Sequence, residues 1–328
     1  MIRIGVDANG GDFGVETTVP AAMMAVKEFK DVEIVLYGDE AKIKPLLTNS
    51  ERIKIVHTAV TLDMGEHDPL NAVRNHKDAS LCMAMYAAKN GEVDGVVTSG
   101  PTQCVVMASH IIIRRLKEME RVALCPIVPN LDGNPRLILD VGANVELKKE
   151  HLGEFAVYAS VVAKEVLGID NPTVGMLNIG SEPGKGREFD KEAYEYLNSL
   201  KEINFKGNVE PDEIIDCPTN IVVCDGYSGN ICIKTLEGTA KGMGTMLKQE
   251  VGHNLFALFL KKNFKRFKKR MDSSEVGGAM IFGIGKPVVK AHGNSKPYSY
   301  FNAIAQVKKM VELDIIGKVV KALPKKEA

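Results

Sequence analysis

Short runs of apolar residues recur along the chain, and most of them are rich in Val and Ile. Runs this short are typical of buried strands. The predicted strands are Arg3–Asp7, Val32–Tyr37, Arg52–His57, Gly95–Thr98, Leu124–Val128, Arg136–Val141, Val174–Ile179, Ile221–Cys224 and Val288–Ala291.

Longer segments with apolar residues at helical spacing lie between many of these runs. The predicted helices are Thr17–Phe29, Ala79–Lys89, Thr102–Met119, Glu150–Leu167, Asp190–Leu200, Ser228–Gln249 and Tyr298–Val320. Strands that alternate with helices predict an α/β fold with a mostly parallel sheet covered on both faces. We expect one α/β domain over residues 1–328, and the pattern fits two lobes on one continuous chain as well as a single sheet.

Charge and cysteine content narrow the class of protein. The 328 residues include 42 Lys+Arg and 42 Asp+Glu, and this balance argues against a chain that coats nucleic acid. The six cysteines form no C-x-x-C pair and the seven histidines are dispersed, so the sequence predicts no metal site. The N-terminus lacks a secretory pattern and no apolar run is long enough to span a bilayer, so we expect a cytoplasmic protein.

Five predicted strands run directly into glycine-containing turns. These turns are Asp7–Asp12, Thr98–Thr102, Asn178–Gly186, Asp225–Asn230 and Ala291–Ser295. Ligands of open α/β sheets bind beyond the carboxyl ends of strands, where glycine lets backbone N–H groups approach an anion. For any one loop a tight turn is the simpler interpretation, but five together favour a shared anion site. No G-x-G-x-x-G follows the first strand, and residues 180–186 lack the spacing of a phosphate-binding P-loop.

Three side chains in these turns suit anion chemistry. Lys185 stands between two glycines, from where its ammonium reaches a phosphate, or it is a solvated loop lysine. Asn230 either caps a helix that begins near residue 231 or orients phosphate and donates to an oxyanion. His292 is either a structural histidine or a donor to an oxyanion or leaving group.

Further polar residues have two interpretations each. Asp7 and Asp225 end strands and either form turns or orient the site. Arg74 and Arg187 either contact phosphate or take part in structural ion pairs. Cys104 as an acyl-enzyme nucleophile is a weaker hypothesis, because it lies in an apolar helical run where a buried, inert cysteine is usual.

An apolar tip and a basic amphipathic helix are predicted at residues 254–271. Seven of residues 261–270 are basic and none is acidic. This pattern fits a packed core or dimer interface, an anionic lipid surface, or an acidic protein partner. The residues we expect to contact a membrane or partner are Leu255, Phe256, Leu258, Phe259, Leu260, Lys261 and Lys262.

An ordered set of motifs carries a resemblance that runs from about the first residue to past residue 303. The motifs are Asp7-Ala-Asn-Gly-Gly-Asp12, Ala72-Val-Arg74 with Lys77-Asp78, Leu139-Asp-Val-Gly-Ala-Asn144, Leu177-Asn-Ile-Gly180, Gly184-Lys-Gly186, Val223-Cys-Asp-Gly-Tyr-Ser-Gly-Asn230 and Val289-Lys-Ala-His-Gly-Asn-Ser295. They resemble the PlsX-type phosphate acyltransferases.

The resemblance implies transfer of a fatty acyl group from acyl-[acyl-carrier-protein] to inorganic phosphate, giving an acyl phosphate for phospholipid synthesis. It also implies a dimeric three-layer α/β/α sandwich, similar to phosphotransacetylases and to isocitrate or isopropylmalate dehydrogenases. Peripheral membrane association follows as well, with residues 255–260 matching the family's docking tip.

The expected chemistry needs neither metal nor cofactor. We expect Lys185 to hold phosphate, Asn230 to orient it or bind the oxyanion, and His292 to donate to the oxyanion or leaving thiolate. The residues expected to bind phosphate and substrate are Asp7, Gly10, Gly11, Arg74, Ser99, Gly100, Gly180, Gly186, Asp225, Gly229 and Gly293.

The sequence departs from the family pattern at a few positions. Asn9 stands where Met is usual, and Arg187 stands where Asn is usual. The family reads Ser-Ala-Gly-Asn-Thr-Gly where this chain has residues 98–103, which places Pro101 and Gln103 in that loop. Two other functions stay open: a phosphotransacetylase-like enzyme that uses acyl-coenzyme A, and a non-enzymatic scaffold at the membrane.

Overall fold

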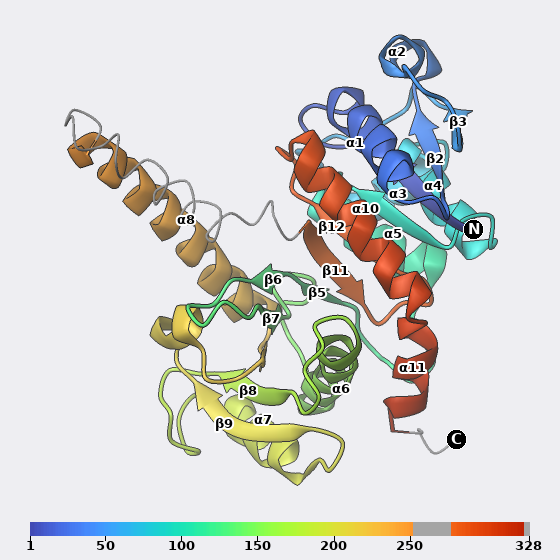
Figure 1. Cartoon of the computed structure of the whole chain (residues 1–328). Coiled ribbons are helices and arrows are strands. Elements are labelled where there is room, and N and C mark those ends of the chain that lie inside the picture. Colours follow the sequence, from blue (N-terminus) through green and yellow to red (C-terminus); the bar gives the residue numbers. More distant parts are fainter. Residues whose placement is uncertain (252–276, 325–328) are drawn as a thin grey trace.

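The strands form two sheets in the computed structural model, which describes residues 1–251 and 277–324 (Figure 1). The first sheet has the order β3-β2-β1-β4-β12-β11-β5. Its strands are β1 (Ile2–Asp7), β2 (Val32–Gly38), β3 (Ile53–His57), β4 (Gly95–Thr98), β5 (Ala123–Cys125), β11 (Gly278–Phe282) and β12 (Val288–Ala291). Only β11 runs against its neighbours, so β1, β4 and β12 place their carboxyl ends at one edge.

The second sheet has the order β6-β7-β10-β8-β9. Its strands are β6 (Ile127–Val128), β7 (Arg136–Leu139), β8 (Thr173–Leu177), β9 (Asn204–Val209) and β10 (Ile221–Val223). The last four are parallel, so β7, β8 and β10 also end at a common edge.

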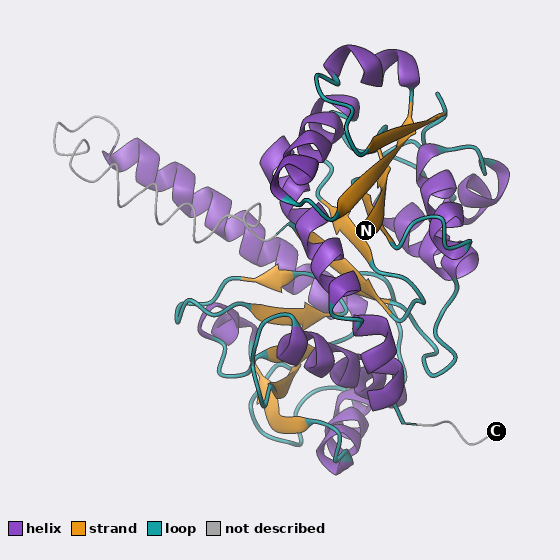
Figure 2. Cartoon of the chain, turned by 45° about the vertical axis from the view of Figure 1, so that its right-hand side comes forward, coloured by secondary structure: helices purple, strands orange, loops and turns teal. Residues whose placement is uncertain are grey.

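Helices cover both faces of each sheet (Figure 2). On the first sheet, α1 (Val15–Glu28) and α10 (Pro297–Glu312) pack on one face, and α4 (Ser80–Lys89) and α5 (Thr102–Ala108) pack on the other. On the second sheet, α6 (Lys149–Glu165) lies against β7, β8 and β10. It also contacts α7 (Glu188–Ser199) and α11 (Ile315–Ala322). The remaining described elements are α2 (Glu40–Ile43), η1 (Lys44–Leu46), α3 (Pro69–Asn75), the π-helical turn η2 (Ser109–Ile113), η3 (Pro211–Asp216) and α8 (Gly226–Val251).

The two sheets are joined by side chains that pack in common apolar cores. The chain passes from β5 to β6 at Pro126, which has no N–H to donate to a ladder. The rings of Tyr158 on α6 and Phe282 on β11 stack with centroids 4.0 Å apart. Each of the two apolar cores contains residues from both sheets. The carboxyl edges of the sheets are thereby held in a fixed relation.

Helix α8 begins at the second sheet and projects away from the body of the molecule (Figure 1). Its outer part exposes Met243, Met246 and Leu247 at helical spacing. No helix in the described ranges is long and apolar enough to cross a membrane.

The predicted α/β architecture with a mostly parallel sheet is confirmed, with the strands divided between two sheets. Three predicted elements are wrong in detail. The strand Leu124–Val128 is two strands in different sheets. The helix Thr102–Met119 stops at residue 113, because three consecutive β-branched Ile residues disfavour helix and Arg114 is left-handed, with φ +74°. The helix Tyr298–Val320 breaks at Asp314, whose φ of +47° ends one helix while its carboxylate caps the next.

Candidate active site

The first sheet contributes a buried carboxylate at its carboxyl edge. Asp7 ends β1, and its two carboxylate oxygens accept hydrogen bonds from Ser80 Oγ at 2.5 Å and Thr98 Oγ1 at 2.7 Å. Burial raises the pKa of Asp7, and these hydrogen bonds oppose the rise. Asp7 therefore ties together the turns that follow β1 and β4 and is enclosed by them.

The predicted glycines of this edge let three loops meet closely. Ser99 Oγ donates to the Gly10 carbonyl at 2.8 Å, and the Asp12 N–H donates to the Gly293 carbonyl at 2.8 Å. Gly11 has φ +84°, and a Cβ there would lie 2.6 Å from Ser99 Oγ. Gly100 also faces this cluster, since its N–H donates to Thr98 Oγ1 at 2.9 Å. The structure thus brings five predicted residues together, with loop packing as the immediate reason for the glycines.

A lysine that the sequence reasoning did not single out lies at the end of β12. Lys290 is half-buried, and its ammonium donates to the Ala291 carbonyl at 3.1 Å. Burial lowers the pKa of Lys290, and the carboxylates of Asp12 and Glu237 oppose that change. No carboxylate in the described ranges pairs with this ammonium within 4 Å, so it is a partly desolvated cation available to an anion.

His292 lies two residues further along and faces helix α8. Its Nε2 is 3.6 Å from Glu237 Oε1, and both side chains are about half exposed. The contact with His292 lowers the pKa of Glu237. Because β12 belongs to the first sheet and α8 to the second, this pair spans the two carboxyl edges.

The second sheet holds an ion-pair network at its own carboxyl edge. Arg187 Nη2 donates to Asp225 Oδ2 at 2.6 Å and to Asp190 Oδ1 at 2.9 Å. Asp225 also accepts from the Ser228 N–H at 2.7 Å, which caps the start of α8. Burial alone would raise the pKa of Asp225, but the bonds from Arg187 and Ser228 hold it below its usual value. Of the two interpretations of Arg187, the structure shows the ion pair.

Helix α8 begins at Gly226, so Asn230 lies in its first turns and is not the cap. The Asn230 side-chain amide donates to the Val141 carbonyl at 2.9 Å. A Cβ at Gly229 would lie 2.0 Å from the Asp140 carbonyl oxygen, so this glycine allows the helix to approach the end of β7. Asp140 in turn accepts from the N–H groups of Gly142, Ala143 and Asn144, which fixes that loop beside Asn230.

Lys185 lies on the exposed side of the loop after β8. Its ammonium is 3.9 Å from Glu182 Oε2, and half of the side chain is exposed. The loop is shaped by Asn178, whose side-chain amide donates to the Lys185 carbonyl at 3.2 Å. Gly186 has φ +90°, and a Cβ at Gly180 would lie 2.9 Å from Lys185 Cγ. The structure shows no contact among Lys185, Asn230 and His292.

One departure from the family pattern joins the two sheets directly. Gln103, in the first turn of α5, places its Nε2 3.5 Å from the Gly142 carbonyl oxygen. Pro101 occupies the N-cap position of the same helix and makes no side-chain capping hydrogen bond. Asn9, the other departure near this edge, donates to Thr58 and accepts from the Asp39 N–H, so it links the turns after β1, β2 and β3.

The remaining predicted residues lie apart from this region or outside the described ranges. Arg74 is exposed on α3. Burial raises the pKa of Cys104 to about 11, which keeps it a neutral thiol and argues against the acyl-enzyme hypothesis. The predicted tip and basic helix at residues 254–271, with all seven membrane or partner residues, lie outside the described residues. Within residues 1–251 and 277–324, no three His, Cys, Asp or Glu side chains gather as metal ligands.

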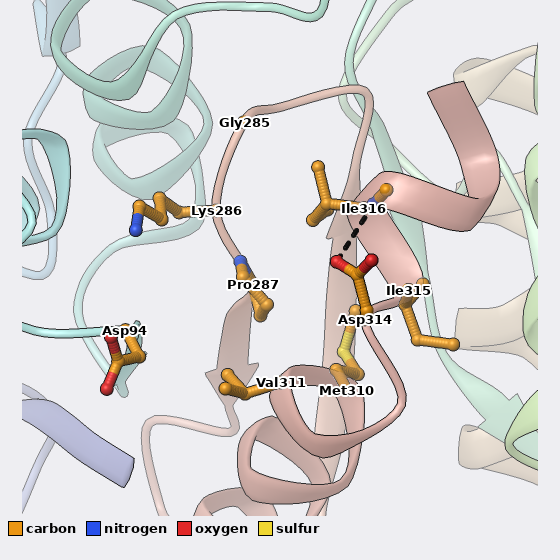
Figure 3. A pocket seen from close by; sticks show the side chains of 10 residues that line it. Asp94, Gly285, Lys286, Pro287, Met310, Val311, Asp314, Ile315 and Ile316 are labelled. Atoms are coloured by element: carbon orange, nitrogen blue, oxygen red, sulfur yellow. Dashed lines mark hydrogen bonds between the residues drawn. The ribbon is translucent and has the colours of Figure 1, made fainter. Parts of the chain in front are cut away.

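A separate pocket of about 260 Å³ lies at the opposite edge of the first sheet (Figure 3). Asp94 and Lys286, which precede β4 and β12, line it. Asp314 closes one side, where its carboxylate accepts from the Gly317 N–H at 3.3 Å. The pocket is thus distant in the fold from the turns that carry the candidate site.

The chain matches the model of a family described as fatty acid synthesis protein over residues 2–318. It is 46% identical to a phosphate acyltransferase of Acholeplasma laidlawii over 325 residues, covering 97% of each chain. Phosphate acyltransferases of Bacillus cereus and Streptococcus pneumoniae are 42% and 41% identical, over 99% and 97% of both chains.

Solved structures share the fold at low sequence identity. The EutD phosphotransacetylase of Staphylococcus aureus superposes with a TM-score of 0.60 at 14% identity, covering 95% of this chain and 94% of that one. A phosphotransacetylase of Streptococcus pyogenes gives a TM-score of 0.56 at 20% identity, covering 98% and 94%. The predicted likeness to phosphotransacetylase folds is therefore confirmed.

Proposed function

The chain belongs to the fatty acid synthesis protein family, and on that premise we propose that it transfers a fatty acyl group from an acyl carrier protein to inorganic phosphate. Acyl transfer to phosphate follows from near full-length identity of 41–46% to phosphate acyltransferases, and this is the observation that carries the function. The carrier protein as donor is the finer part of the proposal, and the family description supports it, because it links the family to fatty acid synthesis.

The reaction places two demands on the protein. A phosphate oxygen attacks the thioester carbonyl, the C–O bond forms, and the carbonyl oxygen becomes an oxyanion. When the carbonyl is restored, the C–S bond breaks and the thiolate takes up a proton. The protein must therefore hold a dianion against the thioester and then stabilise the oxyanion, effects of several kcal/mol and about 3 kcal/mol respectively.

The two carboxyl edges supply groups for both demands. We assign phosphate to the unpaired ammonium of Lys290 together with the loop amides around Gly10 and Gly293. Lys185 is a second phosphate contact in this proposal, from the opposite sheet. Cationic donors of this kind suit phosphate because they carry charge as well as hydrogen bonds.

The reacting carbonyl belongs, in this proposal, between Asn230 and His292. The Asn230 amide is already oriented by its bond to Val141, and one of its N–H groups remains for an oxyanion. In this proposal His292, whose Nε2 lies 3.6 Å from Glu237 Oε1, donates a proton to the departing thiolate. No metal or cofactor enters this scheme.

The proposal also includes a homodimer and an anionic membrane surface as partners. Helix α8 supports it, because it projects away from the body of the molecule and exposes Met243, Met246 and Leu247. These partners rest on the resemblance and on that exposed face.

The donor is tested by comparing acyl-carrier protein with acyl-coenzyme A of the same chain length at fixed phosphate. We expect kcat/KM for the carrier-protein donor to be at least tenfold higher. A preference for the coenzyme A donor would support the phosphotransacetylase-like alternative. A folded protein that turns over neither donor would support the scaffold alternative.

A further inference from the structure

A hollow of about 690 Å³ lies beside the segment that follows α5, and we call it the basic hollow. Its charged and titratable lining is His110, Arg114, Arg115, Lys117 and Glu120. None of these residues belongs to the candidate active site. The chain as a whole has no net charge, so a local excess of cations here needs its own explanation.

Both ends of the stretch from residue 102 to residue 122, which contains α5 and the lining of the basic hollow, lie beside the candidate active site. At its start, Gln103 contacts the Gly142 carbonyl. The helix and its π-helical turn then run to Ile113, and at 1.5 Å per residue the distance from Gln103 to Ile113 is about 15 Å. At its end, the Asn144 side-chain amide donates to the Val122 carbonyl at 2.6 Å. Since Gly142 and Asn144 belong to the same turn after β7, the basic hollow lies about one short helix away from the reacting groups.

The arginine and lysine side chains of the basic hollow are exposed and have no carboxylate partner in the described ranges. Arg114, Arg115 and Lys117 are exposed, and none has a carboxylate partner within 4 Å in the described ranges. The one lining acid, Glu120, is engaged by His151 Nε2 at 3.1 Å. Burial, together with the charges of Arg115 and Arg121, lowers the pKa of His110.

The segment that carries the cations is held rigidly in an unusual conformation. Arg114 is left-handed, with φ +74°, and follows a π-helical turn, a feature often found at functional sites. The Arg114 carbonyl accepts from the Gly285 N–H at 3.2 Å, and the Leu116 N–H donates to the Gly283 carbonyl at 3.0 Å. The Arg115 guanidinium donates to the backbone carbonyl of Glu120. These hydrogen bonds fix the backbone, while the charged side chains of Arg114 and Lys117 stay exposed to solvent.

We propose that the basic hollow is the docking surface for the acidic face of the carrier protein, with Arg114 and Lys117 as its principal contacts. The inference rests on the proposed carrier-protein donor. Separated cations around an open hollow suit several carboxylates on a protein surface better than one small anion, which needs converging donors. Charge complementarity of this kind sets the rate and specificity of encounter. In this proposal the thioester must then span the roughly 15 Å from the basic hollow to the candidate active site at the start of α5.

The test is the double variant Arg114→Glu with Lys117→Glu. We expect its KM for acyl-carrier protein to rise at least tenfold, with kcat and the KM for phosphate unchanged. Activity with an acyl-pantetheine donor, which lacks the protein surface, should equal that of the wild type. The wild-type KM for the carrier should rise with ionic strength, and that dependence should be much weaker in the variant.

Two controls separate charge from folding and position. Arg114→Lys with Lys117→Arg keeps the charge and should keep the wild-type KM. Lys42→Glu with Lys44→Glu reverses two exposed cations on α2 and η1, and should also leave the KM unchanged. All variants are compared by thermal unfolding, so that a misfolded variant is recognised.

An unchanged KM for the carrier in the charge-reversal variant would overturn the proposed docking surface. So would an equal loss with both donors, or a loss confined to binding of phosphatidylglycerol vesicles, which would assign the basic hollow to lipid. Failure of the wild type to use acyl-carrier protein at all is a different result, because it would overturn the proposed donor itself.

Discussion

His292 Nε2 lies 3.6 Å from Glu237 Oε1, and this pair joins the carboxyl edges of the two sheets. The histidine follows a strand of the first sheet, and the glutamate lies on a helix that begins at the second. Lys290 is on that strand, and the negative charge of Glu237 favours its charged ammonium as well. The candidate site is thus built from both sheets, and substitutions on either side should affect one reaction.

Lys290→Met should weaken phosphate binding. The ammonium has no carboxylate partner in the described ranges, so an anion is its natural partner, and we expect the KM for phosphate to rise at least tenfold. Because burial disfavours the charged ammonium, thermal stability should stay level or rise. Steady-state kinetics with varied phosphate and a melting curve check both.

Lys286→Met is the matched control, since Lys286 lies at the other end of the same strand, in the pocket of Figure 3. It should leave the KM for phosphate unchanged. Lys185→Ala tests the second proposed phosphate contact in the same assay. An unchanged phosphate KM in Lys290→Met would remove Lys290 from the site.

Asn230→Ala should reduce kcat far more than stability. Loss of the hydrogen bond to Val141 costs about 1 kcal/mol of unfolding free energy. Loss of an oxyanion donor lowers kcat by about 10²–10³-fold. A variant with a small fall in kcat, in line with its stability loss, would show that the amide only fixes the turn after β7.

Arg187→Asn restores the residue usual in the family and should destabilise this chain in a pH-dependent way. The Arg187 bond helps to hold the pKa of Asp225 below its usual value, so its stabilisation is present above about pH 4 and is lost as pH falls through the folded-state pKa. Because Arg187 is more than half exposed, we expect about 1 kcal/mol at pH 7. Urea unfolding at pH 7 and pH 3 checks it, and a difference that grows toward pH 3 would contradict the assignment.

Gln103→Gly should change substrate use with little change in stability. A side-chain contact of 3.5 Å is a weak hydrogen bond, so its loss should cost less than about 0.5 kcal/mol. The glycine opens space between α5 and the turn after β7, and we expect the KM for a long-chain acyl donor to fall. Equal KM values for wild type and variant across donor chain lengths would show that Gln103 does not limit the site.

Much of the fold was predictable because buried parallel strands are short Val- and Ile-rich runs, as in β2 and β10. The edge strand β9 was missed because Asn204–Val209 is polar and contains a glycine. The break at Asp314 was missed because apolar spacing continues across it, and only the backbone shows its left-handed residue.

The candidate site was predictable at the level of its loops. Glycine after a strand marked the turns that meet around Gly11 and Ser99. Lys290 was missed because a lysine inside a strand is usually interpreted as an edge or surface residue, and the sequence does not show that the folded chain partly buries it. The role of Asp140 was equally hidden, since the backbone groups that it binds come from a turn that is irregular in sequence.

Acyl phosphate formation tests the central claim most directly. Purified protein is incubated with long-chain acyl-carrier protein, with and without inorganic phosphate, and the product is trapped with hydroxylamine while free carrier thiol is measured. We expect phosphate-dependent hydroxamate in a one-to-one ratio to released thiol. Thiol release that is independent of phosphate, or no release by the folded protein, would contradict it.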